Sequence, residues 1–383
     1  MKMNSTTKTD LTIGMDLGDK NHEVCLLDAD GNVAGRAKVG CSPEAVAKFF
    51  ELHRGALVAM ETGTHSRWVS RMAEAAGLSV LVGNARKLRA IWASKQKSDV
   101  RDAEMLARIA RLDPKLLCPI QHRSEKTQAL LSMIQARDQL VCARGALISH
   151  VRGVVKGFGA RVNKCSTESF HTKAELPEVL RDALAPVLSM IEKHTETIRN
   201  YDRRIEEQVA KNPDALRLMQ VPGVGPLIAL AFILTIEEAG RFEKSRTVGA
   251  FVGLAPRRDQ SGDTDKQLHI TKEGNTYLRR LLVTAAHRIL GPFTEDCDVR
   301  SHGLRIAERG GKNAKKRAVV AVARKLAVLL HALWKNGTDY QPQRAKKPDA
   351  TRAGAATDDA THELSNAWKT APRELPMTGK LAA

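Results

Sequence analysis

The stretch that decides the fold lies near the start of the chain and reads Leu11-Thr12-Ile13-Gly14-Met15-Asp16-Leu17-Gly18. It is apolar and bounded by glycine, which predicts a buried strand. Its single acid, Asp16, is out of place there, because burying an unpaired carboxylate costs several kcal/mol. Asp16 therefore either caps the strand and opens a turn with Gly18, or it belongs to a site where further carboxylates meet it.

The segments that follow predict a mixed α/β sheet. Three short strands separated by turn residues indicate an antiparallel meander, and helices and strands alternate after it. We expect strands at 11–16, 22–27, 33–39, 56–60 and 78–82, with helices at 45–52 and 67–76.

Three further acids stand where they could join Asp16. Glu61 ends a buried strand, which is the usual edge for a site in an α/β sheet, although it could also be a solvated loop acid. Asp99 and Asp102 open a helix that runs to about residue 112, and their spacing puts them on one face. Acids in a first turn also favour the helix dipole, so capping is the alternative for this pair.

Positive side chains crowd the same helix start, among them Lys97 and Arg101. Cations beside carboxylates fit a site that holds a metal and a phosphodiester together. Hard oxygen ligands without a His/Cys cluster point to Mg²⁺, and two such ions can activate the attacking oxygen and stabilise the leaving one.

The order Asp, Glu, Asp, Asp on this topology resembles the RuvC-like branch of the RNase H fold. Actin-like ATPases and sugar kinases begin with a similar strand and hairpin. They also need a second glycine-rich phosphate loop, and the sequence contains none.

Two long amphipathic helices are expected in the middle of the chain, at 124–157 and 177–209. They form either an antiparallel hairpin within the chain or a coiled coil that joins protomers, and we favour the second. Cations near the break between them could touch nucleic acid or simply form a solvated face.

The C-terminal part contains Val221-Pro222-Gly223-Val224-Gly225-Pro226, the pattern of a helix-hairpin-helix motif. Gly223 and Gly225 would let the backbone approach a phosphate next to the following helix N-terminus. A plain helical hairpin is the alternative. Further along, Ser261 lies in a polar stretch that predicts a loop or turn.

Composition narrows the class of partner and the compartment. The formal net charge is +18, so a polyanion is the first partner to expect. No apolar run is long enough to span a bilayer, and no secretion signal is recognisable. The six cysteines form neither a zinc pattern nor a disulfide framework, which makes a reducing cytoplasm the default.

Taken together, these motifs resemble the DEDD-type insertion-sequence transposases that are guided by a bridge RNA, relatives of the Piv pilin-gene invertases. The likeness covers residues 11–334. It is carried, in order, by Asp16, METG at 60–63, KSDVRDAE at 97–104, VPGVGP at 221–226, GLAP at 253–256, QSG at 260–262, ITKEGN at 270–275 and YLRR at 277–280.

The resemblance implies a role for each matching residue. Asp16, Glu61, Asp99 and Asp102 would bind Mg²⁺, and Ser261 would be the nucleophile that forms a transient phosphoserine link to DNA. Many members have Ser-Gly-Gly at this point, whereas this chain has Ser261-Gly262-Asp263. Residues expected to contact nucleic acid are Lys97, Arg101, Gly223, Gly225, Arg257, Arg258, Lys266, Lys272, Arg279 and Arg280.

The resemblance also implies an architecture and partners. The domains would be a RuvC-like domain (1–122), a long-helix oligomerisation region (123–210) and a serine transposase domain (211–335). The remaining residues, 336–383, are polar and without periodicity, a composition that predicts a disordered tail. Dimers would assemble into tetramers in which sites are shared between subunits, with donor and target DNA and a bridge RNA bound.

Three function classes follow from this pattern. The leading hypothesis is a recombinase that exchanges DNA strands through a serine nucleophile and a divalent-metal site. The alternative is a RuvC-like structure-specific endonuclease that uses metal-activated water. A non-catalytic nucleic-acid-binding protein is disfavoured, because all four acids are present.

Overall fold

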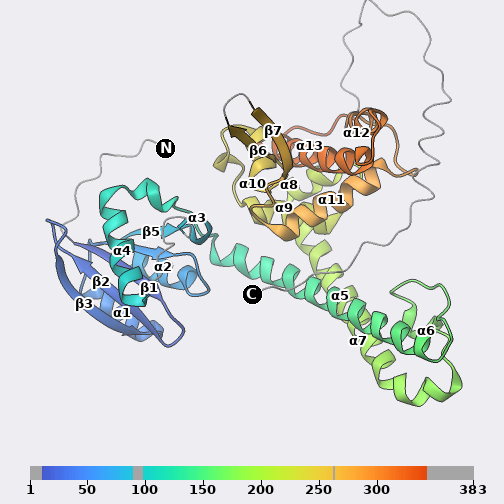
Figure 1. Cartoon of the computed structure of the whole chain (residues 1–383), viewed down its shortest axis with the longest axis horizontal. Coiled ribbons are helices and arrows are strands. Elements are labelled where there is room, and N and C mark those ends of the chain that lie inside the picture. Colours follow the sequence, from blue (N-terminus) through green and yellow to red (C-terminus); the bar gives the residue numbers. More distant parts are fainter. Residues whose placement is uncertain (1–10, 89–97, 262–263, 343–383) are drawn as a thin grey trace, which may run out of the picture. The chain divides into compact units, whose positions relative to one another are not determined.

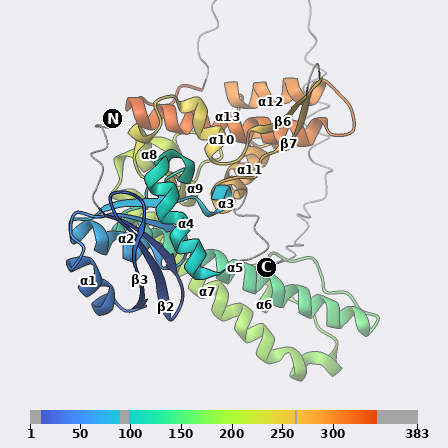
Figure 2. The same ribbon diagram turned by 60° about the vertical axis from the view of Figure 1, so that its left-hand side comes forward.

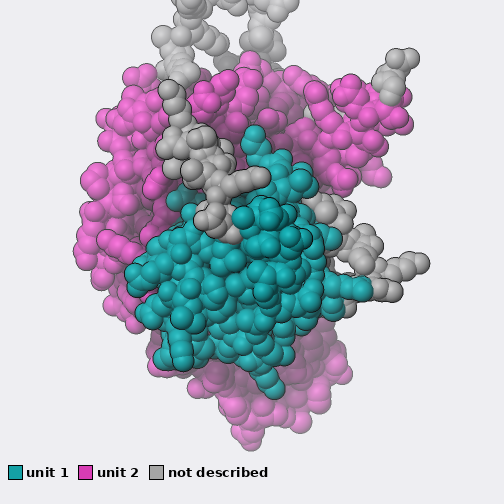
Figure 3. Space-filling view, turned by 90° about the vertical axis from the view of Figure 1, so that its left-hand side faces the viewer, with its two compact units in different colours: residues 1–123 teal, residues 124–383 magenta. Residues whose placement is uncertain are grey.

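The chain divides into two compact units, Met1–Arg123 and Ser124–Ala383, coloured separately in Figure 3. A computed structural model describes residues 11–88, 98–261 and 264–342. Within these residues, no helix combines the length and the apolar character that crossing a membrane requires. Figure 1 labels the elements of both units.

The first unit is built on a five-stranded sheet with the order β3-β2-β1-β4-β5. The central strand β1 pairs antiparallel with β2 and parallel with β4. This confirms the mixed sheet that the alternation of strands and helices predicts. The strands are β1 (Thr12–Leu17), β2 (Asn21–Leu27), β3 (Val33–Gly40), β4 (Leu57–Glu61) and β5 (Ser79–Gly83).

Helices cover both faces of this sheet. On one face Ile13 and Met15 pack with the apolar side chains of α1 (Pro43–Glu51) and α2 (Ser66–Ala75). The opposite face is covered by α4 (Asp99–Leu112), whose Ala103 and Ala107 contact β2. The short α3 (Ala85–Leu88) follows β5. The sheet is thus the middle layer of a three-layer unit.

The two longest helices, α5 (Glu125–Gly157) and α7 (Arg181–Ala210), pack antiparallel within one chain. Arg137 forms an ion pair with Asp202 at 2.5 Å, and Arg144 donates a hydrogen bond to Thr195 at 3.2 Å. Figures 1 and 2 both show the helices side by side. Their apolar stripes therefore pack against each other within one chain, as in the intrachain hairpin and not the coiled coil between protomers that we favoured from the sequence. Association of protomers stays a prediction.

The remainder of the second unit is a helical core with one β-hairpin. Its largest apolar cluster is contributed by α9, α11 and α13. The elements are α6 (Phe170–Lys173), α8 (Pro213–Met219), α9 (Pro226–Ile236), α10 (Val248–Phe251), β6 (Pro256–Ser261), β7 (Thr264–Ile270), α11 (Thr276–Leu290), α12 (Asp298–Glu308) and α13 (Ala314–Asn336).

Residues 337–342 differ from the expectation that the tail is disordered from residue 336 onward. The backbone N–H of Tyr340 donates to the Gln220 side chain at 2.8 Å, and the carbonyl of Pro342 accepts from the N–H of Asp298 at 3.0 Å. The Tyr340 ring also packs against the core. Composition alone misses this, because one aromatic anchor is enough to hold a polar segment. The rest of the expected tail, 343–383, lies outside the described residues.

Candidate functional site

Asp16 and Glu61 lie side by side at the carboxyl end of two neighbouring parallel strands. The register of β1 and β4 pairs Gly14 with Ala59 and Met15 with Met60, so the next residues along are the two acids. Adjacent strands are about 4.8 Å apart, and residues in register project to the same face. Both acids are half-buried. The strand ends therefore bring together two carboxylates that are 45 positions apart in the sequence.

Helix α4 covers the face on which these two acids lie. A Cβ added to Gly14 would stand 1.9 Å from the carbonyl oxygen of Ala103 and 2.6 Å from the backbone nitrogen of Ala107. The helix backbone thus rests directly on the strand, which only glycine permits. Since side chains alternate along a strand, Asp16 shares the face of Gly14, and Glu61 shares that of Ala59.

The contacts of α4 fix its direction along the sheet. Near its C-terminus, Arg108 donates to the carbonyl of Gly31, in the turn at the far end of the sheet. In its middle, Glu104 pairs with Arg36 at 2.8 Å, level with Gly14 through the strand register. The first turn of α4, with Asp99 and Asp102, consequently lies towards the end of the sheet that carries Asp16 and Glu61.

Electrostatics give a second indication of where Asp99 lies. The pKa of Lys38 is raised, first by its hydrogen bond and charge interaction with Glu23 and also by the charge of Asp99. Lys38 pairs with Glu23 across the sheet, and Glu23 pairs with Asp16. We call this end of the sheet the carboxylate edge, defined by Asp16, Glu61, Asp99 and Asp102.

The N-cap of α4 is a serine, and neither of the two acids in its first turn takes this position. Ser98 is the N-cap, and its hydroxyl accepts a hydrogen bond from the N–H of Arg101. Asp99 is exposed and Asp102 half-buried, one turn apart on the same side of the helix. The helix dipole favours both charges, so stabilisation of the helix start is an alternative role for this pair.

The carboxylate edge brings acids to the ends of two strands and the start of a helix, but it does not form a closed metal-binding site. In the part of the chain that the structure describes, no three His, Cys, Asp or Glu side chains are grouped closely enough to hold a metal ion. Asp16, Glu61 and Asp102 each have a polar or charged interaction already. Arg101 is exposed on the first turn of α4, whereas Lys97 lies outside the described residues. The donor set itself, four carboxylates on one edge, has the chemistry that Mg²⁺ prefers.

Ser261 belongs to the second unit and is the last residue of β6. Its cross-strand partner is Thr264 on β7, so it lies next to the tip of an exposed β-hairpin rather than in the loop or turn that its polar surroundings predict. Its side chain is exposed, which leaves the hydroxyl accessible. The expectation of a loop was wrong because β6 and β7 are almost wholly polar and lack the apolar alternation by which strands are recognised.

The strand pairing of the hairpin shows which of the cations near Ser261 lie on the same face as the serine. Lys266 pairs with Asp259, two residues before Ser261, and therefore shares its face. Arg258 pairs with Gln267 and projects to the other face, while Arg257 lies at an irregularity in the pairing. Lys272 follows β7 with a left-handed backbone, and all four cations are exposed. Lys266 is thus the cation whose strand position best matches that of the serine.

Two predicted arginines on α11 have partners inside the unit. Arg279 donates to the backbone carbonyls of Val252 and Glu273 at 3.1 and 2.9 Å. Arg280 pairs with Asp138 of α5, which raises its pKa, and lies over the Tyr277 ring. These contacts give both side chains structural roles.

The two glycines of the predicted helix-hairpin-helix turn have different surroundings. The turn joins α8 to α9, and Gly223 adopts a left-handed φ of 79°. A Cβ at Gly223 would be 3.1 Å from the carbonyl oxygen of Ala285, so close packing on α11 explains this glycine. Gly225 is the N-cap of α9 and faces open space. Of the two, Gly225 is the one that leaves room for a ligand.

Comparison with known proteins agrees with the motifs. Residues 13–159 match a family described as the DEDD transposases of IS110, and residues 215–296 match one described as "Transposase IS116/IS110/IS902 family". The two matches together cover more than half of the chain. The first contains the carboxylate edge, and the second contains Ser261 and its hairpin.

Individual relatives extend the likeness over most of the chain. A transposase for insertion sequence element IS1111A from Coxiella burnetii is 27% identical over 86% of this chain and 91% of its own length. A probable family 20 transposase from Pseudomonas aeruginosa is 29% identical, over 86% of this chain and 98% of its own. A pilin gene-inverting protein from Moraxella lacunata is 23% identical over 62% of this chain and 66% of its own. The chain belongs to the IS116/IS110/IS902 family of transposases.

Proposed function

We propose that this chain is a DNA transposase that moves an insertion sequence by cleaving and exchanging DNA strands, with Ser261 as nucleophile and the carboxylate edge as its metal site. The observation that carries the proposal is the position of Asp16 beside Glu61, with the first turn of α4 directed to the same end of the sheet. Membership of the transposase family supports DNA as the substrate.

The first unit supports a RuvC-like assignment by its topology. Three antiparallel strands followed by two parallel ones, in the order 3-2-1-4-5, agree with that fold. Helix α4 lies across the central strand, and the acids are at the carboxyl ends of the strands, where α/β sheets place their sites. An actin-like ATPase would need a second glycine-rich phosphate loop, which the sequence lacks.

The acids, the serine and a lysine have separate roles in the proposed reaction. Asp16, Glu61, Asp99 and Asp102 would hold Mg²⁺, which when bound supplies positive charge to the reacting phosphate. The Ser261 oxygen attacks phosphorus and forms a phosphoserine bond, while the bond from phosphorus to the leaving sugar oxygen breaks. The serine proton passes to a carboxylate, and the leaving oxygen takes up a proton from water. In the second step a hydroxyl of the partner strand attacks the phosphoserine phosphorus and loses its proton to water, while the bond from phosphorus to Ser261 breaks and the serine oxygen takes its proton back from the carboxylate. Lys266, on the face of Ser261, steadies the negative charge of the phosphate.

Guidance and assembly are part of the same proposal. Family resemblance favours a bridge RNA that selects donor and target DNA, and a tetramer in which the carboxylate edge of one subunit meets Ser261 of another. The paired helices α5 and α7 form an elongated hairpin that could carry such contacts between subunits. The second candidate is a RuvC-like endonuclease that uses water, and it is favoured by the fact that the carboxylate edge lies entirely within the first unit.

Substitution of the serine tests the proposal. Ser261→Ala should lower strand exchange at least about a thousandfold, because loss of a nucleophile removes the covalent route altogether. Thr264→Ala, its exposed cross-strand partner, is the matched control and should retain activity. Binding of DNA should be the same in all three proteins.

Strand exchange by Ser261→Ala at the rate of the unsubstituted protein would remove Ser261 from the mechanism. DNA cleavage without exchange by the same variant would support the water-using endonuclease instead.

A further inference from the structure

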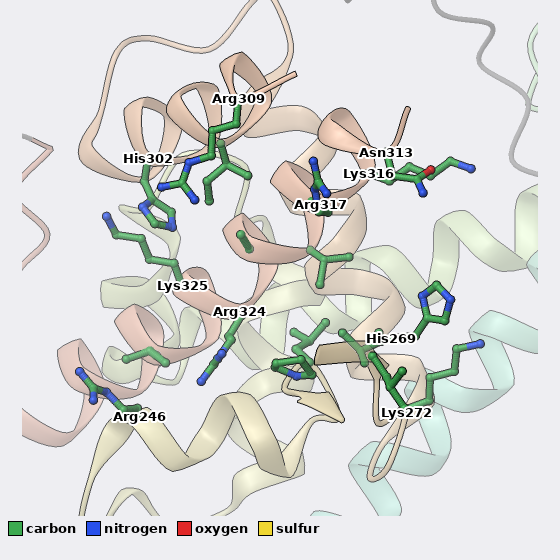
Figure 4. Close-up of a pocket in the computed structure, with 18 residues that line it drawn as sticks. Arg246, His269, Lys272, His302, Arg309, Asn313, Lys316, Arg317, Arg324 and Lys325 are labelled. Carbon is green, nitrogen blue, oxygen red and sulfur yellow. The ribbon is translucent and has the colours of Figure 1, made fainter. Parts of the chain in front are cut away.

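The second unit has an open groove of about 1480 Å³ between its β-hairpin and the helices α12 and α13. Figure 4 shows cationic and histidine side chains from all these elements around the same space. The volume exceeds the roughly 300–1000 Å³ of most small-molecule sites. A groove of this size that is open to solvent suits a segment of a polymer better than a metabolite.

One complete face of α13 forms the long side of the groove. Its lining residues recur at intervals of three and four, which is the spacing of one helix face. They alternate in character, since a basic turn is followed by an aliphatic turn and then by a second basic turn. These residues are Lys316, Arg317, Val320, Ala321, Arg324 and Lys325. The two basic turns are eight residues apart, or about 12 Å along the helix.

The charge of the groove has one sign. Arg309 at the end of α12 and Lys272 after β7 add to the cations of α13, and no Asp or Glu lines the groove in the described part of the chain. Arg317 donates to the carbonyl of Gly310 at 3.1 Å, a contact that leaves its charge uncompensated. The pKa of His302 is lowered by burial and then by Lys325, Arg305 and Arg309, as expected in a positive field.

The floor of the groove is aliphatic. The buried Leu254 and the half-buried Val320 line it, and none of the described lining residues is Phe, Tyr or Trp. A duplex presents its charged backbone outward and would place phosphates against this apolar floor. An unpaired strand can turn its phosphates to the cations on both sides and its sugars towards the aliphatic residues. Binding here would therefore rest on backbone charge and not on the aromatic stacking that many single-strand sites add.

The groove and Ser261 share the same hairpin. Pro256 at the start of β6 and His269 and Ile270 at the end of β7 line the groove, while Ser261 is at the other end of β6. Five residues of extended strand span about 17 Å. A nucleic-acid strand bound in the groove could therefore continue along the polar β6 strand as far as Ser261.

We propose that this groove binds an unpaired stretch of nucleic acid. Its phosphates would contact Arg309 and the two basic turns of α13, of which Lys316 is the first residue. The suggestion that the bound strand leads to the nucleophile rests on the proposed function of Ser261. Binding in the groove does not depend on catalysis. The shared chemistry is a single-stranded phosphodiester backbone, which either DNA or a guide RNA would supply.

Fluorescence anisotropy with the full chain tests the proposal, with a labelled 20-nucleotide single-stranded DNA, its RNA counterpart and the matching DNA duplex as probes. The groove variant is Arg309→Gln/Lys316→Gln, and both residues are exposed. The control is Arg305→Gln/Lys312→Gln, which removes the same charge from nearby positions that do not line the groove. Thermal melting of each variant establishes that it is folded.

We expect the groove variant to bind single strands about tenfold more weakly at 100 mM salt. Its salt slope should fall by about 1.4, since each phosphate contact contributes about 0.7 for single strands. The control should stay within about threefold of the unsubstituted protein. A larger loss for RNA assigns the groove to the guide, and a larger loss for DNA assigns it to the substrate strand; either result supports the proposal.

Equal affinities of the groove and control variants for single strands would overturn the proposal. A loss of affinity confined to the duplex would also overturn it. The same holds if a polyglutamate peptide binds tightly and the groove variant loses affinity for the peptide as much as for single strands. Ser261→Ala should bind single strands as the unsubstituted protein does, so failure of the proposed chemistry would leave this result unchanged.

Discussion

The carboxylate edge of the first unit and the cationic groove of the second are built on opposite principles. The acids stand at the ends of regular elements, and their neighbours Gly14 and Met15 are fully buried. The groove is lined by exposed and half-buried cations, most of them on one face of α13, with the end of the β-hairpin on its other side. The first site depends on backbone packing that allows little movement, whereas the second depends on surface charge. Mutations should therefore damage the two in different ways.

The sharpest test of this difference compares two buried glycines. Gly14→Ala should destabilise the first unit by about 3 kcal/mol or more, because its Cβ meets the α4 backbone, which cannot rotate away. Gly303→Ala in α12 meets only the side chains of Val322 and Leu290. Its cost should be smaller, about 1–2 kcal/mol, since two buried side chains and not a helix backbone must move, and alanine favours a helix by about 1 kcal/mol.

Hydrogen exchange of peptides from α4 and from α12 measures both effects separately, even if the units unfold independently. Gly14→Ala should deprotect α4 strongly, and Gly303→Ala should change α12 little. Equal deprotection in the two variants would mean that the backbone of α4 is not held against the sheet as described.

A smaller effect should be common to both units. In the described part of the chain five histidines have a lowered pKa, with burial as the largest cause in each. The unfolded chain therefore binds more protons below its ordinary histidine pKa of about 6.5, so stability should fall as the pH drops from 7.5 to 5.5. The residues are His22 and His122 in the first unit and His287, His302 and His331 in the second.

Thermal melting at these two pH values checks this expectation. Carboxylates with lowered pKa values titrate below this window and do not obscure it. His122→Gln should reduce the pH dependence of the first unit, whose His122 ring contacts the Ser66 hydroxyl at 3.0 Å. An unchanged melting temperature between pH 7.5 and 5.5 would contradict the expectation.

Sequence patterns predicted the first unit well, because each of its strands is short, apolar and bounded by turn residues. The parallel pairing of β1 and β4 could be anticipated from the helix between the strands, and with it the approach of Asp16 and Glu61. The nearness of α4 to β1 was not anticipated. It depends on Gly14, because only a residue without a side chain lets the backbone of Ala103 approach the strand so closely. A glycine within a strand does not by itself predict such a contact.

The second unit was predicted less completely. The apolar stripes of α5 and α7 were recognised, but a stripe does not say whether its partner is in the same chain. The hairpin of β6 and β7 was missed because its residues are polar, and helix α12 was missed because Gly303 and its charged residues weaken the helical pattern. Arg309, His302 and His269 could not be linked to α13, since only folding brings these segments around one groove.

The most direct test of the account is to trap and map a covalent protein–DNA adduct. Quenched reactions with Mg²⁺ and a bridge RNA, digested and analysed by mass spectrometry, should show a nucleotide linked through phosphate to the peptide containing Ser261. Asp16→Asn should lower the yield of this adduct at least about a hundredfold, since the metal contributes several kcal/mol, while Asp30→Asn at the opposite end of the sheet should not. An adduct on another residue, or one whose yield is indifferent to Asp16, would contradict the claim that the two units act on one phosphate.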